Sequence, residues 1–400
     1  MTEALATPVR ASDTRIIALV SAAHFVSHYY ILLLPPLFLF VKAEYGVSFT
    51  ELGFALTAFN ITSALFQTPA GFLVDRVGAR VVLVGGMVIG AAAIAVAGVV
   101  PSFWVLVAMF GVAGIANAVY HPADYALLSH FVSAERMSQA YSIHSFAGFF
   151  GSAVAPVTLL LLESVVGWRG AFLAAAALAL AVAALIMAQS PGTMDAERPA
   201  KQQNASTGEA VGWRLLFSAP ILLNLVFFAM FAIANAGIQN YSVVALGALF
   251  ATPLGTANAA LTTYLMLSAA GVLVGGYVAG RYGRHGLIAI GGSAALAVLA
   301  VAIGNVDLHA ALLMIAMGAA GFCFGFITPS RDMIVRAVTP PGSFGKVFGF
   351  VTTGFNVGGV LSPLAFGWLM DTNHPQGVFY VTGAAALLAI LTILPSLRRR

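Results

Sequence analysis

Charged side chains are scarce in this sequence. Asp, Glu, Lys and Arg make up 8% of the 400 residues and hydrophobic residues 60%, whereas a soluble domain usually carries about 25% charged residues. So few charged residues cannot cover the water-exposed surface of a soluble domain. We therefore expect the chain to be embedded in a lipid bilayer. The net charge of +4 comes from basic residues spread over short loops, which argues against a nucleic-acid surface.

Other absences narrow the functional classes. The single cysteine, Cys323, can form no intrachain disulfide. The sequence contains no G-x-x-x-x-G-K-[ST] phosphate loop, so we expect an ion gradient rather than ATP to supply energy, and no cofactor. The HExxH and GxGD protease patterns are also missing. An intramembrane enzyme or a non-transporting sensor remains the alternative from a different class.

Apolar runs of about 20 residues dominate what is present, and an α-helix of that length crosses about 30 Å of hydrocarbon. Alternating ten-residue segments typical of membrane barrels are absent. The fold class predicted is therefore an all-α polytopic membrane protein with twelve transmembrane helices. Their predicted ranges are 16–41, 51–73, 81–100, 103–130, 138–162, 169–189, 214–241, 256–279, 286–304, 308–335, 346–370 and 377–396.

One long polar stretch, residues 190–212, divides the chain near its middle. Its Pro, Ala, Gln and charged residues are typical of a flexible linker. We therefore predict an N-terminal six-helix bundle at 1–189, a cytoplasmic linker at 190–213 and a C-terminal six-helix bundle at 214–400.

The basic residues predict the topology. With both termini cytoplasmic, only Lys42 and Arg169 fall on the opposite side, as the positive-inside rule expects. The cytoplasmic side would receive Arg10, Arg15, Arg76, Arg80, Arg136, Arg198, Lys201, Arg214, Arg281, Arg284, Arg336, Lys346 and Arg398 to Arg400.

The two halves repeat one another. An offset of 207 residues matches Gly111 with Gly318, Gly114 with Gly321, Pro122 with Pro329, Gly151 with Gly358 and Pro156 with Pro363. Two related bundles imply a pseudo-two-fold axis along the membrane normal and a binding site at their interface.

The segment between the second and third predicted helices reads GFLVDRVGAR. With the twelve spans and the repeat, it resembles the signature G-x-L-x-D-R-x-G-x-R of the major facilitator superfamily (MFS), a resemblance that covers nearly the whole chain. The resemblance implies that this motif helps to latch the cytoplasmic side. In the second copy Gly280 replaces the aspartate, so we expect a weaker latch there. The residues expected in the cytoplasmic gate are Gly71, Asp75, Arg76, Gly78, Arg80, Arg281 and Arg284.

Three stretches resemble the fosmidomycin-resistance group of exporters within that superfamily. They are HFVSH from His24, SFTELGFALTAFNITSALFQTPAGFLVDRVG from Ser48, and His121-Pro122 followed by Asp124. The group tends to carry H-x-x-N-D in its first helix and F-H-P-E in its fourth. Here Ser27 and His28 replace the Asn-Asp pair, and Asp124 stands one place later than the glutamate.

Ionisable residues inside predicted membrane helices mark pathways by default, because they are costly in hydrocarbon. Asn117, His121 and Asp124 are spaced to share one helical face, and Pro122 predicts a kink there. Asp124 is either a proton-binding residue or a gate salt-bridge partner. The offset maps it onto Arg331, which either latches the gate, pairs with the adjacent Asp332, or binds an anion through its guanidinium.

Histidines supply the remaining candidates in the N-terminal half. His24 and His28, and Tyr141 and His144, share helical faces, and histidine titrates near neutral pH. These side chains either carry protons or form neutral hydrogen bonds between helices. We expect no metal site, because the histidines lie on different helices and no Cys or repeated Met pattern accompanies them.

Further uncharged polar residues, which are weaker candidates, lie on helices that line the cavity in the superfamily that this chain resembles. Each is either a cargo contact or a helix-helix hydrogen bond. They are Asn60, Gln67, Asn235, Gln239, Asn240, Tyr264, Thr328 and Asn356.

The function expected is secondary active transport by alternating access, with the two halves rocking around a midplane site. The resemblance implies proton-coupled efflux of a small polar or anionic organic compound across the inner membrane, by a multi-pass protein that we expect to be a monomer. Proton-coupled import of a small carboxylate is the alternative.

Overall fold

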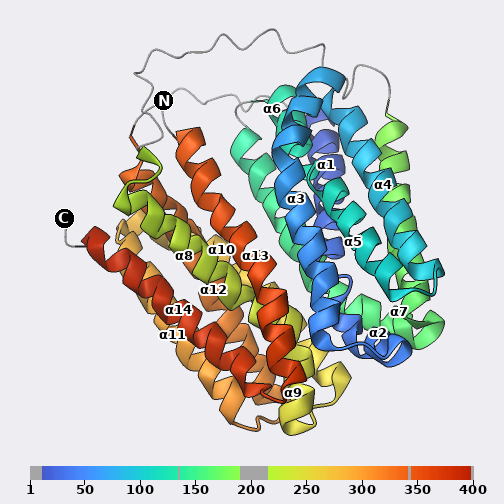
Figure 1. The fold of residues 1–400 in the computed structure, drawn as a ribbon. Helices are drawn as coiled ribbons and strands as arrows, with labels where there is room; N and C mark the ends of the chain where they lie inside the picture. The colour runs from blue at the N-terminus through green and yellow to red at the C-terminus, as the bar shows by residue number, and fades with distance from the viewer. Residues whose placement is uncertain (1–10, 134–135, 190–214, 341–343, 398–400) are drawn as a thin grey trace.

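The computed structural model describes residues 11–133, 136–189, 215–340 and 344–397, and these form helices and short connections without a β-strand. The predicted linker lies outside this part of the chain. Figure 1 shows two helical bundles, one built from each half of the sequence. The N-terminal half contains α1 (Ala11–Ile31), η1 (Pro35–Leu37), α2 (Phe38–Tyr45), α3 (Phe49–Val77), α4 (Ala79–Val99), α5 (Phe103–Asn117), α6 (Tyr120–Phe131) and α7 (Met137–Met187).

The C-terminal half begins its described part with α8 (Ala219–Ala236) and ends it with α14 (Gln376–Leu397). Between them lie η4 (Gly237–Tyr241), α9 (Ser242–Phe250), α10 (Leu254–Tyr282), α11 (His285–Asn305), α12 (Ala310–Val338) and α13 (Phe344–Asp371). Ten segments of the described chain are long and apolar enough to cross a membrane. The predicted all-helical membrane fold is confirmed.

Helix α7 covers two of the predicted spans. At about 1.5 Å per residue, 51 helical residues in one line would be more than twice as long as the bilayer core is thick. Gly167 interrupts the helix with φ 70° and ψ 168°, a conformation that favours glycine. The chain therefore reverses at this residue, where the sequence predicted a loop.

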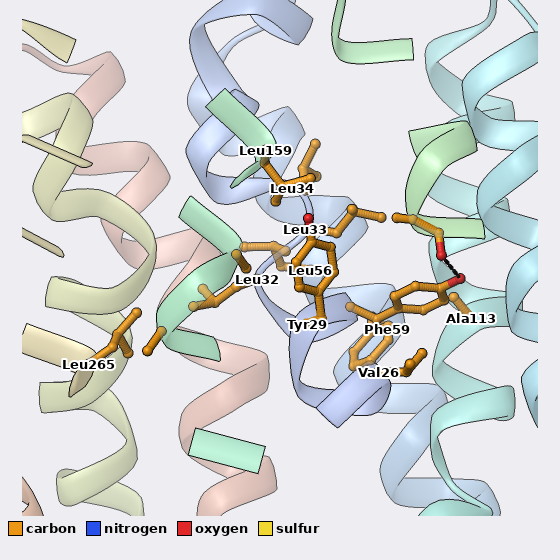
Figure 2. Packing of buried hydrophobic residues seen from close by; sticks show 14 of the residues in the cluster. Val26, Tyr29, Leu32, Leu33, Leu34, Leu56, Phe59, Ala113, Leu159 and Leu265 are labelled. Carbon is orange, nitrogen blue, oxygen red and sulfur yellow. Dashed lines mark hydrogen bonds between the residues drawn. The ribbon is translucent and has the colours of Figure 1, made fainter. Parts of the chain in front are cut away.

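The first predicted helix, 16–41, is wrong as one continuous element. It ends at Ile31 and resumes after a short 3-10 turn at Pro35 and Pro36, because proline cannot donate the backbone hydrogen bond that a helix interior needs. The break is buried: Leu32, Leu33 and Leu34 are inaccessible to solvent and belong to the hydrophobic cluster that also contains Leu56 and Leu159 (Figure 2).

The predicted kink in 103–130 is confirmed, and it interrupts the helix over two residues, Ala118 and Val119, whose backbone angles stay in the helical region. Helix α5 ends at Asn117 and α6 begins at Tyr120. The ring of Pro122 would collide with the carbonyl of residue 118 in a continuous helix. Asn117 lies before this interruption, but the predicted common face is retained: Asn117 bonds to Ser27, and His121 and Asp124 lie against His24, so all three side chains face α1.

The internal repeat is visible in the packing. A Cβ on Gly114 would lie 2.2 Å from the Phe59 carbonyl oxygen, and a Cβ on Gly321 would lie 2.0 Å from the Tyr264 carbonyl oxygen. Both glycines let one helix lie directly against the backbone of its neighbour, α5 on α3 and α12 on α10. Residues matched by the repeat thus make equivalent contacts in the two halves.

The two halves touch directly at one end, here called the Asp371 end, which carries α2 and α9. Asp371 Oδ1 accepts a hydrogen bond from the Phe49 N–H at 2.8 Å, and Oδ2 accepts from the N–H and hydroxyl of Thr50 at 2.7 and 2.5 Å. A carboxylate is favourable at a helix N-terminus. Deeper in the molecule, the Thr57 hydroxyl donates to the Val360 carbonyl.

At the opposite end, here called the Arg80 end, α3 and α13 diverge (Figure 1). A space of about 610 Å³ separates α7 from α10 and α12 there, with Tyr141, Ser145, Gly276 and Pro329 among its lining residues. The molecule is therefore closed at the Asp371 end and open at the Arg80 end.

Candidate functional site

A buried cluster of ionisable side chains joins three helices of the N-terminal half. Asp124 on α6 is fully buried, and its Oδ2 lies 3.0 Å from Nε2 of His144 on α7 and 3.5 Å from Nδ1 of His24 on α1. The His24 and His144 rings stack with centroids 3.8 Å apart. We call these three residues the Asp124 cluster.

The cluster leaves polar atoms unsatisfied. Within the described chain, Asp124 Oδ1 and His24 Nδ1 are buried without a hydrogen-bond partner. A buried carboxylate with an unpaired oxygen is costly in a medium of low dielectric constant. Two histidines against one carboxylate oxygen allow a proton to be held between the three side chains.

Two further predicted histidines border the cluster. The His28 ring centroid is 4.6 Å from that of His24, and its Nδ1 is 3.3 Å from the Ser152 hydroxyl. The His121 centroid is 5.2 Å from that of His24. The fold thus brings all four predicted histidines together.

The location of the histidines on different helices does not argue against a metal site, so that reason for expecting none is wrong. The absence of a metal site stays a prediction. The ligand atoms of His24, Asp124 and His144 lie within 4.8 Å of one another although they come from three helices. Separate helices therefore do not keep them apart.

Asn117 has a structural partner set of its own. Its Oδ1 accepts from the Ser27 hydroxyl at 2.7 Å, and its Nδ2 donates to the Ser63 hydroxyl at 3.1 Å. These bonds tie α5 to α1 and α3, beside the helix break. Ser27 was noted in the sequence only as a departure from the H-x-x-N-D pattern, and Ser63 was missed because a lone serine in an apolar helix carries no recognisable pattern.

A central cavity of about 160 Å³ lies between the halves. It contains four amide side chains, four phenylalanine rings and one tyrosine. Its lining residues are Tyr30, Ile31, Leu56, Phe59, Asn60, Phe110, Ala232, Asn235, Ala236, Gln239, Asn240, Phe324, Phe355 and Gly359. Both halves contribute, as predicted for a site at the interface.

One side of the central cavity is a π-helical turn, η4, which directly follows α8. Such turns are rare and often occur at functional sites. Within and beside it, the Tyr264 hydroxyl donates to Asn235 Oδ1 at 3.0 Å, and Asn235 Nδ2 donates to Gln239 Oε1 at 2.8 Å. The predicted residues Asn235, Gln239 and Tyr264 therefore form one chain of hydrogen bonds.

Arg331 does not meet Asp124. Its Nη2 lies 2.9 Å from Asp332 Oδ1, and its guanidinium carbon lies 4.4 Å, 5.4 Å and 4.9 Å from the ring centroids of Phe228, Phe231 and Phe355. The local pairing with Asp332 is the observed alternative, and the cross-interface latch is absent from this structure.

The residues of the predicted gate motif lie at the open Arg80 end. Gly78 joins α3 to α4 with φ 103°, which explains the glycine. Arg80 is buried and donates to the carbonyls of Met187 and Gln189, so it fastens α4 to α7 within its own half. Gly71 lies within α3, Arg76, Arg281 and Arg284 are exposed, and the Asp75 side chain lies outside the described residues.

Two predicted residues lie away from both centres. Tyr141 is 3.1 Å from the Ser129 hydroxyl and lines the space at the Arg80 end. Asn356 is half-buried on α13 and is not among the residues that line the central cavity.

Comparison with known proteins identifies the family. The family model described as Major Facilitator Superfamily matches residues 20–256 and 230–400. The chain is 24% identical over 395 residues to the fosmidomycin resistance protein of Escherichia coli K12, covering 96% of this chain and 94% of that one. It is 22% identical to a D-galactonate transporter of Escherichia coli O6:H1, covering 88% of each chain.

A solved structure shares the fold. The bacterial homologue of the human lysosomal transporter Spinster, in an inward-facing and unoccupied conformation, superimposes with a TM-score of 0.77 at 14% identity, covering 98% of this chain and 99% of that one. The family match, the helical membrane fold and the cavity between two related halves agree. This chain belongs to the Major Facilitator Superfamily.

Proposed function

We propose that this protein exports a small polar or anionic organic compound across the bacterial inner membrane by alternating access, in exchange for protons. The observation that carries the proposal is the central cavity between two related halves that are bonded together at the Asp371 end and separated at the Arg80 end. A site between two gates is what alternating access requires.

The positive-inside rule assigns the Arg80 end to the cytoplasm in this proposal, because most of the loop arginines lie on that side. The chain then crosses the membrane twelve times, with two crossings in α7, and both termini are cytoplasmic. With this orientation we infer that the structure, closed at the Asp371 end and separated at the Arg80 end, is the inward-open state, and that the protein works as a monomer.

The Asp124 cluster supports proton coupling. A membrane-buried carboxylate that faces the protein interior beside histidines is a common feature of proton relays. Gain or loss of a proton at Asp124 changes its attraction to His24 and His144, which lie on two other helices. Such a change biases helix packing, and therefore the equilibrium between the two states.

The names of the relatives support a small polar or anionic cargo. One relative confers fosmidomycin resistance and another transports D-galactonate. Proton-coupled import of a carboxylate remains the alternative, since the fold does not set direction. We expect a transporter of this kind to catalyse no chemical reaction.

Purified protein in liposomes tests the function. A panel containing fosmidomycin, D-galactonate and neutral hexoses is offered with and without an imposed pH gradient. We expect accumulation of at least one compound that requires both the protein and the gradient. Uptake at the same rate with and without the pH gradient would contradict proton coupling. If no compound moved, the result would contradict transport of this class of compounds.

A further inference from the structure

We propose that the central cavity recognises an uncharged, hydroxylated ring compound rather than an organic anion. This inference rests on the proposed transport function and specifies the cargo class of the same site. It starts from the lining residues: of those that border the cavity in the described structure, none is Asp, Glu, Lys, Arg or His.

The amides of the cavity are oriented by bonds that they already make. Asn60 Nδ2 donates to the Leu56 carbonyl at 2.8 Å, which leaves its Oδ1 as an acceptor. Gln239 Oε1 accepts from Asn235, which leaves its Nε2 as a donor. Asn240, a half-buried residue of the same lining, brings an amide with both a donor and an acceptor.

A mixed set of donors and acceptors matches hydroxyl groups. Each hydroxyl donates one hydrogen bond and accepts up to two, whereas an ionised carboxylate only accepts. The Asn60 oxygen would repel a carboxylate and attract a hydroxyl. Burying an anion without a cation costs several kcal/mol at the least, and an amide lining does not replace a guanidinium or ammonium group.

Arg331 does not supply the missing cation. Its fork is directed to Asp332, and the rings of Phe228 and Phe355 lie against the guanidinium. Phe355 lines the cavity, whereas Arg331 does not. In this arrangement the guanidinium is engaged with Asp332 and the rings and does not border the cavity, so it does not offer cargo the two parallel hydrogen bonds with which arginine recognises a carboxylate.

The apolar part of the lining suits a ring. Phe59, Phe110, Phe324 and Phe355 come from four helices of both halves. Flat aromatic faces pack well against the C–H faces of a ring, while the amides bond to its edge. The volume of about 160 Å³ is below the roughly 300–1,000 Å³ of pockets for drug-sized ligands, which favours a small cargo.

Matched pairs of sugars test the inference, because they differ in charge and little else. D-Glucose, D-galactose and D-mannose are each compared with the corresponding uronate for binding to purified full-length protein, measured by tryptophan fluorescence. We expect at least one hexose to bind tenfold more tightly than its uronate. An equal or stronger affinity for every uronate, or no binding of any hexose, would overturn the cargo class.

Substitutions locate the binding and guard against misfolding. Asn240→Leu should weaken the best hexose at least tenfold, whereas Asn305→Leu, on α11 outside the cavity, should not change it. Asn240→Arg should raise the affinity for the uronate relative to the hexose, a gain that an unfolded variant cannot show. Unchanged hexose binding in Asn240→Leu would contradict the site.

The liposome panel separates this inference from the proposed function. If D-galactonate moves with the pH gradient and no hexose binds, the transport function stands and the cargo class is wrong. If a hexose binds but no compound moves, the cargo site stands and the transport function fails.

Discussion

The two halves share a backbone plan but differ at three buried positions. Under the offset of 207 residues, His24, Asp124 and His144 of the N-terminal half correspond to Phe231, Arg331 and Val351 of the C-terminal half. In the first half a carboxylate contacts two histidines. In the second half a guanidinium packs on phenylalanine rings.

The difference suggests a division of labour between the copies. The N-terminal half holds an ionisable cluster with unsatisfied polar atoms, a costly arrangement that a purely structural role does not need. The C-terminal half contributes the π-helical turn with Gln239 and Asn240 to the central cavity. We therefore assign ion coupling to the first half and much of the cargo recognition to the second.

The largest effect should follow from making the halves alike at these positions. His24→Phe combined with His144→Val leaves Asp124 without its histidines, so substrate-driven proton movement in liposomes should fall at least tenfold. Exchange of cargo without a gradient should persist, which shows that the protein still folds. Retained coupling would remove the histidines from the proton pathway.

The two equivalent glycine contacts should be equally sensitive to an added methyl group. Gly114→Ala and Gly321→Ala each direct a methyl group at a backbone carbonyl oxygen, and overpacking of this kind costs about 1–3 kcal/mol or more. Both variants should lower the thermal unfolding temperature in detergent. Gly85→Ala and Gly280→Ala are matched controls, because a Cβ there meets nothing within 4 Å. A large loss in one half alone would contradict the equivalent packing.

Asp371 offers a test of whether its hydrogen bonds keep the two halves closed at that end of the molecule. Asp371→Ala removes three hydrogen bonds that close the interface. The population open at the Asp371 end should rise about tenfold, the equivalent of roughly one charge-assisted hydrogen bond. Spin-label distances between the α2–α3 and α13–α14 turns measure it. Asp307→Asn, an exposed carboxylate outside this interface, serves as the control, and identical distance distributions would reject the closure.

The smallest effect concerns Arg331. Arg331→Met keeps an apolar contact with the phenylalanine rings but loses the pair with the exposed Asp332 carboxylate, worth little at the surface, and the cation–π attraction, worth about 1–2 kcal/mol at a partly desolvated site. The unfolding temperature should fall by a few degrees, while proton coupling and the preference for uncharged cargo stay unchanged. A loss of cargo binding in this folded variant would show that Arg331 contributes to the cargo site.

Much of the fold follows from sequence, because apolar runs and the glycine and proline matches of the repeat report directly on helix length and packing. The kink beside Pro122 and the common orientation of Asn117 and Asp124 could be anticipated, but the interruption of the helix at residues 118–119 could not. The π-helical turn and the Asp371 contacts also escaped prediction. They depend on which distant helices meet, and no local pattern specifies that.

For the candidate site, ionisable residues in apolar helices were expected to face the interior, and the structure brings the four predicted histidines together there. Their convergence on Asp124 could not be read from spacing within one helix. Likewise, the charge relation between Asp124 and Arg331 suggested a pair, whereas a nearer partner exists for each: His144 for the first and Asp332 for the second.

The central claim, that protons couple to transport through the N-terminal half, is tested most directly by proton movement during cargo flux. Asp124→Asn is compared in liposomes with Asp332→Asn, a change of the same kind in the C-terminal half, and both are measured with a chelator present to exclude metal effects. We predict that the first variant exchanges cargo without moving protons, while the second retains the wild-type ratio of protons to cargo. An unchanged ratio in Asp124→Asn would contradict the account.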